Sequence, residues 1–213
     1  MTSTAFSAQG TTLQIGTGTG GAKTITAIAL GFPTIVTSAA HALSNGNRGT
    51  LAAFTGANAA TLNAATPNIE NVTTNTFAFD IDTTGQTIVG TAASFTPITY
   101  TNVGNLKTVA GFDGEADEID TTNLASAAKE YLLGITDEGK VTLGLDQKNA
   151  DTGQAAMRAA RAASSLQNFR MQFPDGTTAT FSAFVKKFST TLGVNQAVKA
   201  DVDLRISGPV TWS

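Results

Sequence analysis

The sequence predicts a mainly β protein that contains a single α-helix. Short runs of β-branched and aromatic residues recur along the chain and are separated by Gly, Pro, Asn and Asp, which is the pattern of strands joined by turns. Only the segment from about 152 to 166 has helical periodicity instead. Charged residues make up 14% of the chain, against roughly one quarter in an ordinary soluble domain. Such a weakly charged surface repels its own copies little, which favours self-assembly but is also compatible with a monomer.

The first hundred residues differ in composition from the rest of the chain and are rich in Thr, Ala, Asn and Gly. Their only charged side chains are Lys23, Arg48, Glu70, Asp80 and Asp82. Turn signals such as Ser44-Asn45-Gly46 and Thr84-Gly85 separate short β-branched runs. These runs are Thr24–Ile28, Thr34–Thr37 and Thr74–Ile81. We therefore expect several short strands in a small β module.

Clearer strands follow after residue 100. Lys140–Leu145 and Phe169–Phe173 have strand character. Pro174-Asp175-Gly176 predicts a tight turn, because Pro presets φ and Gly accepts a positive φ. Thr178–Lys186 is then the hairpin partner of the preceding strand. Val198–Ser207 alternates apolar residues with charged and polar ones, which predicts a half-buried strand with a charged outer face.

One helix is expected from about Thr152 to Leu166. Asp151 at the N-cap, with Gln154 three residues later, matches a capping box. The helical periodicity predicts two opposite faces. One consists of small residues that can pack on a sheet, namely Ala156, Ala159, Ala160 and Ala163. The other is polar and consists of Gln154, Arg158, Arg161 and Ser165. Arg158 and Arg161 either lie in solvent or pair with carboxylates across a subunit contact, and both alternatives stay open.

Composition argues against most enzyme classes. The chain has no cysteine, so thiolate nucleophiles, thiolate metal sites and disulfides are excluded. Its one histidine, His41, has no Cys, Asp or Glu nearby in the sequence, and no serine lies in a G-x-S-x-G motif. We expect a structural His41, no catalytic residues, no metal and no cofactor.

The chain also lacks the marks of a nucleic-acid-binding or membrane protein. The formal net charge of −3 and the pI near 5.0 argue against a protein that grips phosphates. No apolar run approaches the roughly 20 residues of a membrane span, and Met1–Gln9 does not resemble a signal peptide. We expect synthesis in the cytoplasm and no membrane partner.

A glycine-rich segment, Gly16-Thr17-Gly18-Thr19-Gly20-Gly21, satisfies the spacing G-x-G-x-x-G and is followed by Lys23-Thr24. A dinucleotide fingerprint or P-loop needs a helix directly after the glycines, whereas Lys23–Val36 is β-branched and broken by Gly31 and Pro33. A flexible joint is the favoured interpretation.

An acidic run stands out from this weakly charged chain. It contains Asp113, Glu115, Asp117, Glu118 and Asp120, with no basic residue between Lys107 and Lys129. A calcium loop would need the D-x-[DN]-x-[DN]-G order, which is missing. A hydrolase built on Glu115, Asp117 or Glu118 would need aromatic and polar partners, which are missing as well. The third alternative is a long exposed loop, either solvated or in contact with another subunit.

The residues from this run onward resemble the tail tube (major tail) proteins of long-tailed, non-contractile bacteriophages. The resemblance begins at Gly114–Leu124 and continues through Ala127–Tyr131, Leu133-Gly134 and Gly139–Leu143. It then takes in the predicted helix, Phe173–Gly176 and the ending Ile206–Ser213, so it spans about half of the chain.

The resemblance implies two packed antiparallel β-sheets, as a sandwich or barrel, flanked by the helix. It implies hexameric rings that stack into a hollow tube in the virion tail, through which DNA passes without specific binding during ejection. The implied partners are further copies of the chain and the tail terminator, tape-measure and baseplate or tip proteins. Carried over by residue, the contact between rings falls on Asp113, Glu115, Asp117, Glu118, Asp120, Thr121, Asn123 and Leu124. The segment Ala127–Leu133 is a further candidate for this contact. Arg158 and Arg161 are the candidate subunit contacts on the helix, with a solvated helix face as the alternative.

The family pattern is interrupted by a long insertion. We expect residues 1–22 and 100–213 to form the tail-tube core and residues 23–99 to form an inserted small β-barrel domain that decorates the outside of the tube. Thr24–Ile28, Val36–Ser38, His41–Gly46 and Val72–Phe77 resemble the first catalytic-cysteine half-domain of ubiquitin-activating enzymes, of which only the fold can carry over because the chain has no cysteine. An alternative function is a carbohydrate- or receptor-binding β module of a virion surface.

Overall fold

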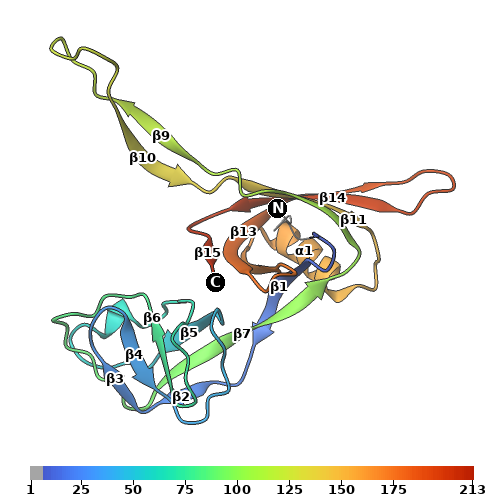
Figure 1. Ribbon diagram of the computed structural model, residues 1–213. Coiled ribbons are helices and arrows are strands. Elements are labelled where there is room, and N and C mark those ends of the chain that lie inside the picture. Colours follow the sequence, from blue (N-terminus) through green and yellow to red (C-terminus); the bar gives the residue numbers. More distant parts are fainter. Residues whose placement is uncertain (1–6) are drawn as a thin grey trace, which may run out of the picture. The chain divides into compact units, whose positions relative to one another are not determined.

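The computed structural model describes residues 7–213, and these fall into two compact units. Among the described residues, unit 1 comprises 7–15 and Thr101–Trp212, and unit 2 comprises Gly16–Tyr100 with Ser213. Strands β1 (Thr12–Thr19) and β7 (Ala93–Val103) carry the chain from one unit to the other. Both units are labelled in Figure 1, and each is described by itself below.

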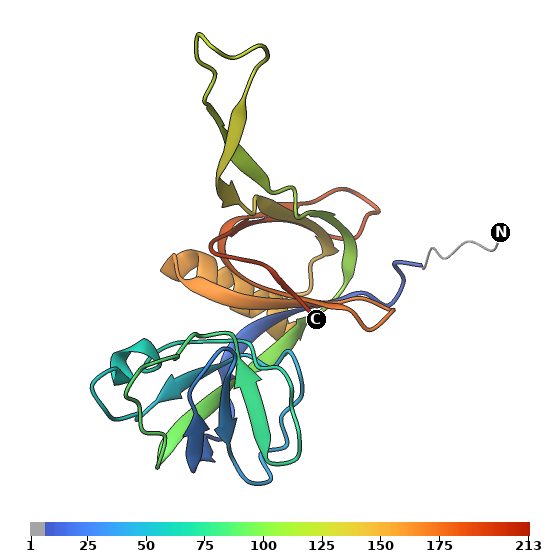
Figure 2. The same cartoon turned by 60° about the vertical axis from the view of Figure 1, so that its left-hand side comes forward.

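Unit 1 is built on one curved antiparallel sheet in the order β1-β12-β13-β14-β11-β8, and β15 also pairs with β13. Figure 2 shows the sheet curling around its interior. The strands are β8 (Leu106–Gly111), β11 (Lys140–Asp146), β12 (Leu166–Gln172), β13 (Thr178–Thr191), β14 (Lys199–Ile206) and β15 (Thr211–Trp212). One hydrophobic core fills the inner side, where Phe169 and Phe181 stack with ring centroids 5.7 Å apart.

The expected strands of this unit are present. Strand β14 buries every second residue from Ala200 to Ile206, as its alternation predicts. The turn at Pro174-Asp175-Gly176 joins β12 to β13, and Gly176 adopts a φ of +93° there. The prediction of a mainly β protein with packed antiparallel sheets and one α-helix is confirmed, and within residues 7–213 no barrel closes.

Helix α1 (Thr152–Ala163) is shorter than expected and packs through a different face. Asp151 caps it, because its carboxylate accepts a hydrogen bond from the Gln154 amide at 2.8 Å. Ser164 ends it in the left-handed conformation, so Leu166 already belongs to β12. The buried residues are Gly153, Gln154, Met157 and Ala160, whereas Ala159 and Ala163 are exposed. The prediction of an all-alanine packing face was therefore wrong.

Glycine at 153 explains this choice of face. A Cβ placed there would meet the Asn102 carbonyl oxygen at 2.2 Å and Val103 Cα at 2.8 Å. Only a glycine lets the first turn of the helix lie directly on the end of β7, and this contact sets which side of α1 turns inward.

Unit 2 consists of two open antiparallel sheets around a second core. In one sheet, β7 pairs with both β2 (Lys23–Ile25) and β5 (Gly49–Ala52). In the other, β4 (Thr34–Thr37) lies between β3 (Ala27–Ala29) and β6 (Thr76–Phe79). A short 3-10 helix, Ala59–Thr61, follows β5. Phe77, Phe79 and Phe95 are fully buried between the sheets, and the small β-barrel that the sequence predicted is not closed here.

Candidate assembly surface

The acidic run is a β-strand rather than an irregular loop. Strand β9 (Glu115–Asp120) pairs antiparallel with β10 (Tyr131–Asp137), and within residues 7–213 the two strands pair only with each other. Figures 1 and 2 show this hairpin extending beyond the curved sheet of unit 1. The expectation of a loop was wrong because it considered only the acidic segment and not the β-branched and aromatic segment that pairs with it.

Two carboxylates fix the root of the hairpin. Asp113 accepts a hydrogen bond from the Lys140 amide at 3.0 Å, and Asp137 accepts one from the Gly139 amide at 2.9 Å. Asp137 also forms an ion pair with Arg205 on β14. The hydrogen bond from the Lys140 amide lowers the pKa of Asp113, and those from the Gly139 amide and then from Arg205 lower the pKa of Asp137. Asp113 therefore anchors the hairpin to the sheet.

The tip of the hairpin, residues 121–130, is held by local hydrogen bonds. Lys129 pairs with Asp120 at 2.8 Å, and this contact, followed by hydrogen bonds from Thr122, lowers the pKa of Asp120. The Thr121 amide donates to the Glu130 carbonyl, and the Asn123 side chain accepts from the Ala125 amide. Leu124 is fully exposed at the end of this tip.

The remaining carboxylates of the run make no ion pair in residues 7–213. Glu115, Asp117 and Glu118 lie on β9, and none of the three ion pairs found in this part of the chain involves them. The structure thus separates the sequence-predicted contact residues into two groups. Asp113 and Asp120 have partners within the chain, whereas these three point their charges at solvent.

The sequence-based interpretation extended the bridging segment only as far as Leu133 and did not single out the apolar residues on the partner strand. Leu132, Leu133 and Ile135 are 61%, 74% and 86% exposed, and Tyr131 and Ile119 are about half exposed. Such a cluster on a hairpin that packs on no core is unusual for a monomeric protein. The signal was available in the sequence, because residues 131–136 contain no charge and are rich in strand-forming side chains.

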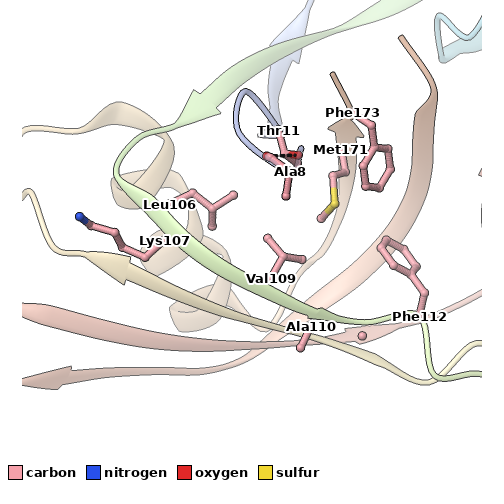
Figure 3. Close-up of a pocket in the computed structure, with 10 residues that line it drawn as sticks. Ala8, Thr11, Leu106, Lys107, Val109, Ala110, Phe112, Met171 and Phe173 are labelled. Atoms are coloured by element: carbon pink, nitrogen blue, oxygen red, sulfur yellow. Dashed lines mark hydrogen bonds between the residues drawn. The ribbon is translucent and has the colours of Figure 1, made fainter. Parts of the chain in front are cut away.

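A second open surface lies at the edge of the sheet in unit 1. Strand β8 pairs with β11 on one side, and its other side has no strand partner among the described residues. A groove of about 360 Å³ runs beside it. Figure 3 shows Leu106, Val109 and Phe112 on one wall, with Met171 and Phe173 from the β12 side on the other. An unpaired strand edge next to an apolar groove is a template for pairing with another chain.

The two arginines expected on the helix differ in their surroundings. Arg158 is half buried, with its guanidinium 5.5 Å from the centre of the Phe188 ring and a hydrogen bond to the Asn149 carbonyl. Arg161 is exposed near the end of the helix. Of these two arginines, Arg161 is the one whose guanidinium is open to solvent.

The other motifs have structural roles. Gly16 and Gly18 lie within strand β1, where the division between the two units falls, and no helix follows them before β2. His41 is buried edge-on against Phe77, and its Nδ1 accepts a hydrogen bond from the Leu43 amide. In the part of the chain that the structure describes, no group of His, Asp or Glu could hold a metal ion, and no helix is long and apolar enough to cross a membrane.

The model of the family described as lambda phage tail tube protein matches residues 82–213, which is more than half of the chain. The chain belongs to this family. The match covers the helix, the hairpin and every strand of the curved sheet except β1, so it includes the region whose sequence resembles tail tube proteins.

Solved structures give more distant likenesses, and no curated protein matches the chain. The tail of an empty gene transfer agent particle, refined with C6 symmetry, is 17% identical, with a TM-score of 0.47 over 54% of this chain and 86% of that chain. A chain of the native gene transfer agent virion is 17% identical, with a TM-score of 0.48 over 54% and 88%. A chain of the six-fold symmetrised baseplate of the anti-feeding prophage is 13% identical, with a TM-score of 0.44 over 54% and 84%. At these TM-scores the likenesses add nothing to the family assignment.

As a member of the tail tube family, the chain is a structural subunit of a bacteriophage tail tube, and its place is in the tail of the virion. The tail tube family also accounts for the weakly charged surface, since each subunit packs against further copies.

Proposed function

We propose that copies of this chain close into rings of six, and that the rings stack into a tube through which DNA leaves the virion of a long-tailed phage. The observation that carries this proposal is the hairpin β9–β10, which exposes apolar side chains on a tail tube subunit. A two-stranded hairpin is marginal in water unless it packs on another surface. The number six is the one that the family resemblance implies.

The hairpin is the proposed bridge between stacked rings. Its contact residues are those expected from the sequence, namely Asp113, Glu115, Asp117, Glu118, Asp120, Thr121, Asn123 and Leu124. Asp113 acts at the root by anchoring the hairpin to Lys140, and the other residues lie along β9 and the tip. Support comes from the exposure of Leu124 and from the carboxylates on β9 that lack ion pairs in the described chain.

The free edge of β8 is the proposed surface for closing the ring. In a closed ring every exposed sheet edge pairs with a neighbouring subunit. A strand edge that would promote aggregation of a monomer therefore stabilises the ring. The apolar groove beside β8 gives the neighbour a surface to bury. Arg161, with Arg158 beside it, is the proposed subunit contact on the helix.

DNA is proposed to pass through the tube without specific binding. The outer face of β14 carries both signs of charge, as Lys199, Asp201, Asp203 and Arg205, and the whole chain has a net charge of −3. Such a surface does not hold phosphates as a basic one does. The role is structural and non-enzymatic, and the proposed partners at the ends of the tube are the tail terminator, tape-measure and baseplate or tip proteins.

Residues 23–99 are proposed to be a domain inserted into a tail-tube core of residues 1–22 and 100–213. The separate core of unit 2 supports this organisation. Its surface also offers a second candidate function. Phe32 is 66% exposed, and hydrogen bonds between Gly31 and Thr83 bring its loop next to Asp82, so a ring and a carboxylate are available to a glycan. A glycan array with the full chain, and with Phe32→Ala as its control, decides this second function.

The ring-and-tube proposal is tested by electron microscopy of the purified chain and of a variant without the hairpin. Gly114 lies against Asp137 and Glu138, so residues 115–137 can be replaced by a short glycine turn. We expect six-fold rings and tubes from the natural chain and unstacked rings from the variant. Persistent monomers of the natural chain under all assembly conditions would contradict the proposal.

A further inference from the structure

The groove beside β8 is the open seam of the curved sheet in unit 1. Strand β8 ends this sheet, and within residues 7–213 the sheet does not close on itself. The core of unit 1 reaches the surface here, because Leu106, Val109 and Phe112 are only partly buried against it. A side chain that covered the seam would remove their exposed apolar area from water, which is favourable.

A turn at residues 8–11 brings the beginning of the described chain onto this groove. The Ala8 carbonyl accepts hydrogen bonds from the Thr11 amide at 3.1 Å and from the Thr11 hydroxyl at 2.8 Å. Gly10 has a φ of +100° in this turn. Ala8 and Thr11 line the groove themselves, and Figure 3 shows them between Leu106 and Met171. The chain that precedes Ala8 therefore enters the turn at the groove.

The six residues that precede Ser7 in the sequence suit an extended strand of the right length. They read Met1-Thr2-Ser3-Thr4-Ala5-Phe6 and contain no charged side chain. Thr and Phe favour strands. Six extended residues span about 20 Å, which is also the length of the six residues of β8. In an extended strand Phe6 and Ala5 point to opposite faces, so one face of this segment carries the aromatic ring.

The edge of β8 offers backbone groups to such a strand. The side of β8 that faces away from β11 has no strand partner among the described residues. Edges of this kind pair readily with another extended segment. A segment joined to the turn by the chain itself has an effective concentration of about millimolar, so it competes well with a second copy of the chain.

We infer that residues 2–6 of the free subunit pair with the edge of β8 and place Phe6 in the groove of their own chain. This covering does not require assembly. Its consequence for assembly rests on the proposed role of β8 in closing the ring. A neighbouring subunit must displace the segment before it can pair with β8, so residues 2–6 restrain ring closure.

Trp212 reports whether the groove is covered in the free chain. Its ring lies 5.4 Å from Phe112 and 5.9 Å from Phe173, and both phenylalanines line the groove. The chain has no cysteine, so Ser3→Cys accepts a single nitroxide label, which quenches tryptophan emission at short range. We expect the labelled chain to lose most of its Trp212 emission, and the loss to stay constant on dilution.

Two matched variants of the labelled chain provide the control, because Phe6→Asp and Ala5→Asp each add one carboxylate to the segment. Phe6→Asp should restore the emission, since a carboxylate is costly to bury without a partner, whereas Ala5→Asp should leave it quenched. Full emission before either substitution, or equal emission in the two variants, would overturn the inference. Quenching that weakens on dilution would place the segment on another copy and would overturn it as well.

The effect on assembly is measured without the label, as the protein concentration at which rings appear by sedimentation. Phe6→Asp should lower this concentration roughly tenfold, because it raises the fraction of subunits whose groove is open. Ala5→Asp should change it by less than roughly threefold. An unchanged or raised concentration for Phe6→Asp would overturn the restraint on ring closure. A chain that shows the quenching but never forms rings would instead overturn the ring proposal and leave the covered groove intact.

Discussion

The side chain of Gln154 joins three backbone groups inside unit 1 by hydrogen bonds. It is fully buried, its Oε1 accepts from the Lys148 amide, and its Nε2 donates to the carbonyls of Gly104 and Asp146. The sequence predicted a capping box at this position, and the Asp151 half of the box is present. The other half is not formed, because the Asp151 amide donates to the Lys148 carbonyl instead of to Gln154. The bond from Gln154 to Gly104 could not be foreseen, because the two residues lie 50 positions apart in the chain.

Replacing Gln154 with methionine should therefore destabilise unit 1. The change keeps the apolar volume but leaves one amide and two carbonyls without their partner, which costs about 2–4 kcal/mol in the free energy of unfolding. Urea denaturation followed by circular dichroism measures the loss. The matched control is Gln172→Met on the exposed side of β12, which should change the free energy of unfolding by less than about 0.5 kcal/mol. A similar loss in both variants would contradict the role given to Gln154.

At the scale of elements, local patterns predicted the strands and the helix but not the hairpin. Val198–Ser207 and Pro174–Gly176 carry their own signals, namely strict alternation and turn residues, and both predictions are confirmed. Glu115–Asp120 has acidic residues on both faces, and nothing in it alone indicates a strand. Its conformation comes from pairing with β10, which begins more than ten residues later.

The root of the hairpin should respond to acid. The pKa values of Asp113 and Asp137 are lowered in the folded chain, so their stabilising effect is complete above the ordinary range near pH 4 and is lost as the pH falls through the lowered pKa values. The amide resonances of Lys140 and Gly139, followed by NMR from about pH 6 to about pH 2, should titrate with midpoints below the ordinary aspartate value.

Two variants provide the control for this titration. Asp113→Asn should abolish the titration of the Lys140 amide, and Asp137→Asn should abolish that of the Gly139 amide. Midpoints at or above the ordinary aspartate value would show that these carboxylates do not hold the root.

At the scale of the whole molecule, the two cores indicate that unit 1 can fold without most of unit 2. The Gly20 amide donates to the Pro97 carbonyl at 2.7 Å, so the chain enters and leaves the intervening segment at neighbouring points. Replacing residues 21–96 with Asn-Gly closes β1 and β7 with a tight turn. We expect this shortened chain to give a dispersed NMR spectrum and one cooperative unfolding transition, because the unit 1 core is complete without the removed residues. A collapsed spectrum would contradict this expectation.

Trp212 is the only tryptophan of the chain. Its ring stacks on Phe173 at 5.9 Å and lies 5.4 Å from Phe112, the residue that leads from β8 toward the root of the hairpin. It is also about half exposed, beside the groove at the free sheet edge. The natural chain thus contains its own fluorophore where a neighbouring copy would arrive, and stopped-flow recording of tryptophan emission can time ring closure without any label.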